Sequence, residues 1–232
     1  MKNRTVRMVN PENFCKPETL LPLIFNRIGY SPATISKSIH EKIKTLITMG
    51  LKTIHIDHVE QTTQITTWGK GSITGKGIQI DSDKWSSLLY HMENPELLHC
   101  FVLTLGESLD KLTEEKKKDS LFDAYVLDAF GSLVVEQAAD QLEKSIFNRS
   151  NFKIYEWSHR FSPGYCDWEL ASGQTAIFQF LNPEKIEVSS LPSGMIIPEK
   201  SISAVMIGAK KATTKSPCLF CKDQHCKYRR AG

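Results

Sequence analysis

A long helical pattern covering residues 121–147 constrains the fold of this chain more than any other feature. Its central part, residues 124–138, carries apolar side chains on more than one face of a helix. Such a helix must be covered on several sides, because burying apolar area contributes about 25 cal/mol per Å². The pattern therefore predicts a central, well-buried helix. Gly131 inside it indicates that a neighbouring element approaches closely, since glycine costs about 1 kcal/mol in a helix relative to alanine.

The remaining elements follow one another without a regular βαβ alternation. A helix is expected from Ser31 to about Met49, with Gly50 ending it. Shorter helices are expected at 82–92, 107–118 and 170–181, and strands at 53–56, 62–68, 78–81, 97–105, 153–157, 185–188 and 202–207. This order predicts an α+β fold, in which helices flank a largely antiparallel sheet. The glycine-rich stretch at 69–77 lacks the spacing of a Walker phosphate loop and is interpreted as a strand connection.

Composition and charge exclude several classes of protein. The chain has 232 residues, of which 41% are hydrophobic and 24% charged, so it can bury a substantial core. No stretch approaches the roughly 20 apolar residues of a membrane-spanning helix. The first 14 residues contain no apolar run typical of a secretory signal, which leads us to expect a cytoplasmic protein. The net charge of +3 is too small to indicate a nucleic-acid partner.

The positive charge is concentrated at the C-terminal end. Residues 209–232 contain seven Lys or Arg and one Asp, which leaves the rest of the chain with a net charge of −3. We therefore divide the chain into an α+β domain at 1–208 and a basic, cysteine-rich tail at 209–232. The tail is either a solvated segment or a docking surface for an acidic partner.

Three of the six cysteines lie close together in this tail. Cys218, Cys221 and Cys226 begin with a C-x2-C pair, a spacing used for zinc and for iron–sulfur clusters. His225 is another candidate ligand, and Cys166 is the only cysteine elsewhere that suggests a fourth. Three interpretations stay open, namely a metal or cluster site, redox-active thiols, and cysteines without a shared role. Cys100 lies in an apolar run and is expected to be a buried small hydrophobe.

A second candidate site is the segment Arg160-Phe-Ser162-Pro163-Gly164-Tyr165, which continues to Trp168. The Ser-Pro-Gly turn exposes backbone groups, and the planar Arg160 guanidinium suits a carboxylate. Tyr165 and Trp168 could form flat apolar walls around a small ligand. The alternative is a rigid turn whose aromatic residues are core and whose arginine pairs with a neighbouring acid. Met195 and Met206 are expected in the core.

Several of these segments together resemble a known family. They are Thr104-Leu-Gly106, Leu127-Asp-Ala-Phe-Gly-Ser132, Glu136-Gln-Ala-Ala-Asp140, Arg160 to Tyr165, a helix with Gln174 and Phe178, and Met195 to Ala204, which contains Pro198-Glu-Lys-Ser201-Ile-Ser203. Their order and spacing resemble the activation (reactivation) domain of cobalamin-dependent methionine synthase, in particular its short stand-alone forms. The resemblance is good over residues 97–208 and loose over the first 96.

The resemblance implies both a fold and a function. The family's domain binds S-adenosylmethionine and presents its methyl group to a cobalamin that has become oxidised, while a donor such as flavodoxin or ferredoxin supplies an electron. By the same resemblance, Arg160 would contact the ligand carboxylate. Residues Ser162, Pro163 and Gly164 would line the ligand, and Tyr165 would be the aromatic residue that ends the motif. The cobalamin would be held by a corrinoid-binding methyltransferase, most simply methionine synthase.

Two features depart from the family pattern. Met206 stands where the full-length form has a tyrosine near the ligand, and the acidic ligand contact from the N-terminal part has no clear counterpart. The cysteine-rich tail is also outside the full-length domain. The leading hypothesis is an accessory protein for reductive methylation of cobalamin. The alternative is a metal-binding or iron–sulfur electron-transfer partner of a corrinoid protein that does not bind S-adenosylmethionine.

Overall fold

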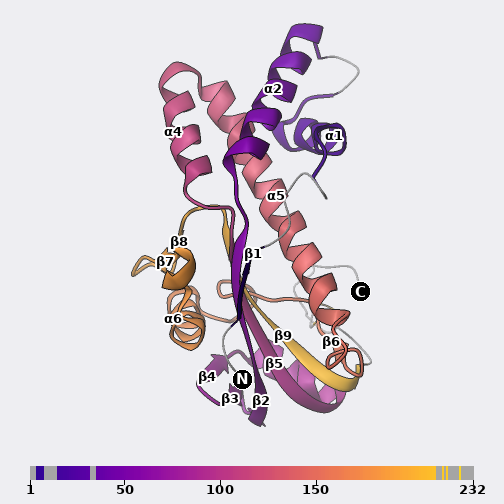
Figure 1. Cartoon of the computed structure of the whole chain (residues 1–232). Coiled ribbons are helices and arrows are strands. Elements are labelled where there is room, and N and C mark those ends of the chain that lie inside the picture. The colour runs from indigo at the N-terminus through magenta and orange to yellow at the C-terminus, as the bar shows by residue number, and fades with distance from the viewer. Residues whose placement is uncertain are drawn as a thin grey trace.

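The computed structural model describes residues 15–31, 35–212, 216, 218 and 225, together with the backbone of residues 4–7. It has the α+β architecture expected from the sequence (Figure 1). Its helices are α1 (Pro17–Ile28), α2 (Lys37–Thr53), α3 (Asp83–Leu88), α4 (Ser108–Asp119), α5 (Leu121–Phe147) and α6 (Leu170–Leu181), with 3-10 turns at Leu89–His91 and Pro183–Ile186.

A single antiparallel sheet forms the middle layer. Its strands are β1 (Arg4–Arg7), β2 (Asp57–Gly69), β3 (Ser72–Gly75), β4 (Ile78–Asp81), β5 (Met92–Thr104), β6 (Glu156–Trp157) and β9 (Ser201–Ala212). The order is β4-β3-β2-β5-β9-β6, and β1 also pairs with β2. Two further strands, β7 (Ser189–Ser190) and β8 (Ile196–Ile197), form a separate hairpin. The expected antiparallel sheet is therefore confirmed.

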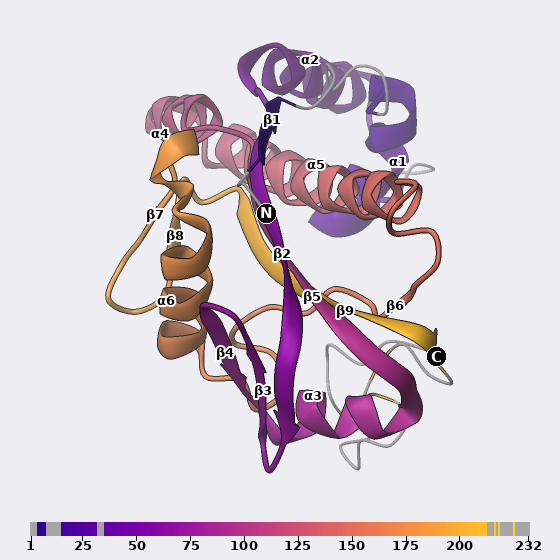
Figure 2. The same cartoon turned by 60° about the horizontal axis from the view of Figure 1, so that its bottom comes forward.

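Helices cover both faces of this sheet (Figure 2). One face packs against α1, α2 and α5, and its core contains Phe101, Leu103, Ala204 and Met206 from the central strands. The opposite face packs against α3 and α6, and its core contains the alternate strand residues, Cys100 and Val205 among them. This alternation is the period of two that a strand covered on both sides requires.

The long helix α5 spans Leu121–Phe147, as the sequence predicts. Ser120 begins it, because its hydroxyl accepts a hydrogen bond from the backbone N–H of Asp123. Twelve of its residues are buried, which confirms a central helix. Gly131 is needed for close approach: a Cβ there would lie 2.8 Å from Leu109 and 2.9 Å from Lys200.

Helix α2 begins at Lys37, with Ser36 as its N-cap, so the expected start at Ser31 was wrong. Three further local expectations were wrong. Gly50 does not end α2 but lies inside it, where a Cβ would meet the Phe130 ring at 2.5 Å. Residues 53–56 are the end of that helix and its exit, and residues 185–188 form the end of a 3-10 turn and its exit in place of a strand. In each case a short apolar run was read as a strand or a glycine as a stop signal, although tertiary packing decides both. Strand β9 also continues to Ala212, beyond the proposed domain boundary at 208.

A buried polar cluster lies on the α5-facing side of the sheet. Glu60 of β2 forms a two-pronged ion pair with Arg149, and its carboxylate lies 3.6 Å from His99 Nε2 and 4.0 Å from His58 Nε2. Burial alone would raise the pKa of Glu60, but the nearby His99 and the ion pair with Arg149 hold it at about 2. Burial lowers the pKa of both His58 and His99, and Arg149 adds to this effect.

This cluster predicts that the protein becomes less stable as the pH is lowered. A histidine whose pKa is lower in the folded state contributes stability that is complete above its unfolded pKa of about 6.5 and is lost as the pH falls below it. Each of the two histidines can remove up to about 1.4 kcal/mol per pH unit from the free energy of unfolding. Urea unfolding at pH 7.5 and 5.5 should show this loss. The His99→Gln variant should show a smaller one.

Glu60 stays ionised throughout this range, so the measurement reports the histidines. His40→Gln, which changes a partly exposed histidine outside the cluster, is the matched control and should keep the wild-type pH dependence. A free energy of unfolding that is the same at both pH values would contradict the assignment.

Candidate functional site

A cavity of about 890 Å³ opens along the outer edge of β9. Its walls come from α5, from the loop at residues 159–166, from the first turns of α6 and from the β7–β8 hairpin. Ser201, Ile202 and Ser203, at the start of β9, line it as well. The cavity therefore reaches both helical layers at the point where the sheet ends.

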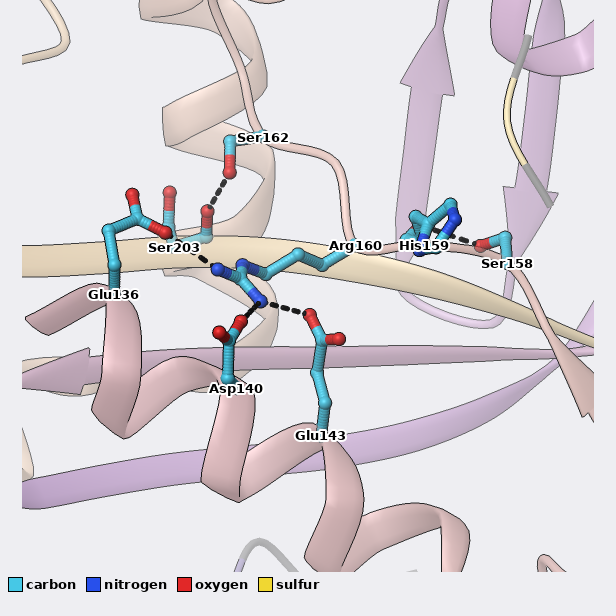
Figure 3. Close-up of polar contacts among 8 residues, drawn as sticks. All are labelled: Glu136, Asp140, Glu143, Ser158, His159, Arg160, Ser162 and Ser203. Carbon is cyan, nitrogen blue, oxygen red and sulfur yellow. Dashed lines mark hydrogen bonds and ion pairs between the residues drawn. The ribbon is translucent and has the colours of Figure 1, made fainter. Parts of the chain in front are cut away.

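The loop at residues 158–166 is tied to β9 on the side away from β5. Phe161 and Val205 exchange two backbone hydrogen bonds of 3.0 and 2.8 Å. The Ser162 hydroxyl donates to the Ser203 carbonyl at 2.6 Å (Figure 3). These contacts act as a short extension of the sheet, and they hold the predicted ligand loop against the strand that lines the cavity.

Arg160 links the same loop to α5. Its guanidinium lies 2.6 Å from each of three carboxylates, those of Glu136, Asp140 and Glu143 (Figure 3). Burial alone would lower the pKa of Arg160, but the three carboxylates raise it above its ordinary value. The expectation that this arginine pairs with a neighbouring acid is thus confirmed.

This pairing leaves part of the guanidinium available. Arginine has five N–H donors, and three of them are used by the α5 carboxylates. Arg160 lines the cavity together with Glu136. Three carboxylates and one guanidinium carry a local charge of −2, so the cluster favours a ligand that brings positive charge beside any carboxylate of its own.

The other residues of the predicted loop have distinct positions. Ser162, Pro163 and Tyr165 line the cavity, and Tyr165 is 42% exposed. Gly164 is not among the lining residues; it adopts a φ of +87°, which glycine accepts without strain, and its N–H donates to the Trp168 carbonyl. Trp168 is buried against Phe161. It is therefore core, as the rigid-turn interpretation of this segment expects.

An apolar rim surrounds the opening. It consists of exposed side chains from the loop, the start of α6 and the β7–β8 hairpin, namely Tyr165, Leu170, Leu191, Met195 and Ile197. Met195 is 58% exposed, so its expected place in the core was wrong. Met206, by contrast, is completely buried as expected. Clustered exposed apolar side chains around a cavity are typical of a contact site.

Two of the cysteines also line this cavity. They are Cys166, in the loop, and Cys218, the first cysteine of the tail. Cys221 and Cys226 lie outside the described residues. Within the part of the chain that the structure describes, no three His, Cys, Asp or Glu side chains are arranged to hold a metal ion. The expectation of a site at Cys218, Cys221 and Cys226 stays a prediction.

The isolated cysteines are buried and unreactive in character. Cys100 is fully buried in the sheet core, as expected, and burial raises the pKa of its thiol. Cys15 donates a hydrogen bond from its thiol to Gln137, and burial raises its pKa to about 12. Neither thiol forms a thiolate at neutral pH, so chemistry involving cysteine is confined to other positions.

Sequence reasoning missed several residues of the site. Glu136, Asp140 and Glu143 are spaced by four and three residues, which places them on one face of a helix, and this spacing was visible in the sequence. Gln174 belonged to the family resemblance but was given no role. Trp85 gave no signal, because the fold brings it to the cavity from a distant part of the chain.

Comparison with known proteins identifies the fold. No family model matches the sequence, and no curated protein does. Among solved structures, a crystal structure of the MetH reactivation domain bound to AdoHcy is similar to this chain, with a TM-score of 0.63 and 13% sequence identity. The similarity covers 94% of this chain and 81% of that one. The fold expected from the resemblance is therefore confirmed. Among the described residues, no helix is long and apolar enough to cross a membrane.

The Arg160 cluster generates a prediction about stability. In an Arg160→Met variant, Glu143, whose side chain is 12% exposed, loses its ion pair with the Arg160 guanidinium. Removing one member of a buried ion pair costs roughly 3–5 kcal/mol, and the partly exposed site places the expected loss near 3 kcal/mol. Denaturant unfolding measures it. Asp140→Asn, at a carboxylate that is more than half exposed, should cost less than about 1 kcal/mol. Equal losses in the two variants would show that Arg160 does not hold the loop through Glu143.

Proposed function

We propose that this chain binds S-adenosylmethionine in the β9-edge cavity and supports the reductive methylation of cobalamin held by a corrinoid-binding methyltransferase, most simply methionine synthase. The observation that carries the proposal is the placement of the Arg160–Tyr165 loop on the cavity wall, in a fold similar to a domain solved with AdoHcy. The cavity volume lies within the range of about 300–1,000 Å³ that is usual for small-molecule sites.

The charges of the site suit an amino-acid end that carries both signs. The two remaining donors of Arg160 would take the ligand carboxylate, and Glu136 beside it would take the ammonium group. S-adenosylmethionine also carries a sulfonium charge, which the net negative Arg160 cluster favours. The loop residues Ser162 to Gly164 would supply the wall, with Ser162 fixed by its bond to β9.

The apolar rim is the surface proposed to meet the corrinoid partner. Tyr165, Leu191, Met195 and Ile197 stand exposed around the cavity that would hold the methyl donor. Cobalamin, held by the partner, would supply the nucleophile, its cobalt reduced by one electron from an external donor of the flavodoxin or ferredoxin class. The methyl group would pass from sulfur to that cobalt, so that a carbon–cobalt bond forms as the carbon–sulfur bond breaks and neutral S-adenosylhomocysteine is left.

The proposal predicts that S-adenosylhomocysteine and S-adenosylmethionine bind to the isolated protein. Arg160→Lys keeps the positive charge that holds the α5 carboxylates. A lysine, however, has only three N–H donors and no planar fork, so it cannot also bind the ligand carboxylate. We expect it to weaken binding roughly tenfold, the effect of about 1.4 kcal/mol. Isothermal titration calorimetry measures both constants.

Arg149→Lys is the matched control, because Arg149 also pairs with a buried carboxylate but lies away from the cavity. It should lower stability and leave the binding constant unchanged. The proposal would be rejected if neither ligand gave any heat of binding at millimolar concentration. It would also be rejected if Arg160→Lys and Arg149→Lys weakened binding equally.

A second function is favoured by the cysteines at the cavity. Cys166 and Cys218 line the same cavity, and Cys218 begins the C-x2-C pair of the tail. A metal or cluster held by Cys218, Cys221 and Cys226 would then lie next to the site of methyl transfer. An iron–sulfur cluster would make the chain an electron-transfer partner of a corrinoid protein, whereas zinc would make the tail structural because zinc has no redox chemistry.

Anaerobic purification followed by elemental and sulfide analysis distinguishes these cases. We expect the wild type to contain iron with sulfide, or zinc, and Cys221→Ser to lose it. Cys15→Ser changes a buried cysteine elsewhere in the chain and should keep the wild-type metal content. A metal-free wild-type protein with titratable tail thiols would rule out the metal and cluster alternatives together.

A further inference from the structure

The fold brings two cysteines that are far apart in the sequence to one cavity. Cys166 is exposed and Cys218 is half-buried, and both line the cavity at the edge of β9. The other two described cysteines, Cys15 and Cys100, are completely buried in the two cores. The cysteines of the body are thus divided into two that serve packing and one, Cys166, that lies where the tail arrives.

The position of Cys166 is fixed by its neighbour in the chain. The Asp167 carboxylate accepts two hydrogen bonds from the start of α3, one from the Ser82 hydroxyl at 2.5 Å and one from the Lys84 backbone N–H at 3.1 Å. These bonds join the loop at residues 158–166 to a helix from a distant part of the chain. A ligand held in this way loses little conformational freedom when it binds a metal.

The tail reaches the same cavity through residues that the structure describes. Ser216 is 4% exposed and lines the cavity, and its hydroxyl accepts a hydrogen bond from the Cys218 backbone N–H at 3.2 Å. The C-x2-C spacing lets Cys218 and Cys221 bind one metal ion together. A metal bound by Cys218 at the cavity is therefore also a metal bound by the tail.

The number of ligands points to Cys166. Zinc in a closed site takes four ligands, and the usual iron–sulfur clusters take four cysteines, so the three cysteines of the tail leave one place open. Cys15 and Cys100 are inside the cores, where burial raises the pKa of both thiols. The exposed His225 is the rival ligand within the tail. Lys84 also lines the cavity, and a positive side chain favours the thiolate form that binds metals.

From this placement we propose that Cys166 is the fourth ligand of a four-thiolate metal centre, which it forms with Cys218, Cys221 and Cys226. The inference rests on the second function proposed above, the metal or cluster site of the tail, and adds to it a ligand from the body of the protein. Zinc and an iron–sulfur cluster share this thiolate chemistry. Either would fasten the tail to the loop that follows Tyr165, beside the cavity.

Cobalt(II) added to the full chain under anaerobic conditions tests the number of thiolates. Tetrahedral Co²⁺ with thiolate ligands absorbs light, and the absorption grows with the number of sulfur atoms bound. Changing even a residue that only supports a metal ligand typically weakens metal binding about 10- to 100-fold. We therefore expect Cys166→Ala to lower the absorption and to weaken Co²⁺ binding at least roughly tenfold. Cys15→Ser and His225→Gln are matched controls and should bind Co²⁺ like the wild type.

Alkylation with iodoacetamide, followed by mass spectrometry, gives a second test that needs no variant. We expect Cys166 and Cys218 to resist alkylation in metal-loaded wild-type protein and to be modified once a chelator has removed the metal. Loading with Co²⁺ alone tests a zinc-type centre, and loading with ferrous iron and sulfide tests a cluster. Cys100 is completely buried and should resist alkylation in both states, so it serves as the internal reference.

The outcomes separate this inference from the tail site on which it rests. If Cys221→Ser loses the metal while Cys166→Ala binds it like the wild type, the four-thiolate centre is wrong and the tail site stands. Weaker binding in His225→Gln but not in Cys166→Ala would also overturn the inference, since the fourth ligand would then be the histidine.

A wild-type protein that binds neither Co²⁺ nor iron with sulfide would overturn the tail site and the inference together. Weaker binding in Cys166→Ala, together with protection of Cys166 in the metal-loaded wild type, would support the four-thiolate centre. That support would hold whether or not the protein binds S-adenosylmethionine.

Discussion

The contact between Arg160 and the carboxylates of α5 is the interaction on which the site depends. The loop at residues 158–166 has little regular structure of its own, and the sheet holds it through Ser158, Phe161 and Ser162. Arg160 adds an attachment to a helix that is itself fixed in the core. Because Glu143 is largely buried, this attachment resists solvent screening more than a surface ion pair would. The position of the loop that forms this cavity wall is therefore fixed relative to α5.

The position of the cavity follows from the layering of the fold. Helix α5 packs on one face of the sheet and α6 on the other, and both reach the edge of β9. A ligand at this edge would therefore meet Glu136 of α5 and Leu170 of α6 at once. No site within a single layer could combine these groups. The exposed apolar rim then leaves one side of the same cavity for a macromolecular partner.

The sequence predicted well those helices and strands whose signals lie within their own segment of the chain. The ranges of α5 and α6 and of β4 were predicted to the residue, because their apolar periods and caps are complete in the local sequence. Gly50 was misread because its role depends on Phe130, eighty residues away in the chain. The site shows the same division. The Arg160–Tyr165 loop could be found from its residues, whereas Trp85 could not, because only strand pairing and helix packing bring it to the cavity.

The position of Met206 shows why one departure from the family pattern does not decide the function. The resemblance noted in the sequence places Met206 where the full-length form has a tyrosine near the ligand. Here it faces the α5 side of the sheet, opposite His99 of β5, and is completely buried. It does not line the cavity, so its inability to donate a hydrogen bond takes no donor from the wall. Arg160 does line the cavity, and the choice between an S-adenosyl ligand and an electron-transfer partner that binds no such ligand depends on what its two remaining N–H donors bind.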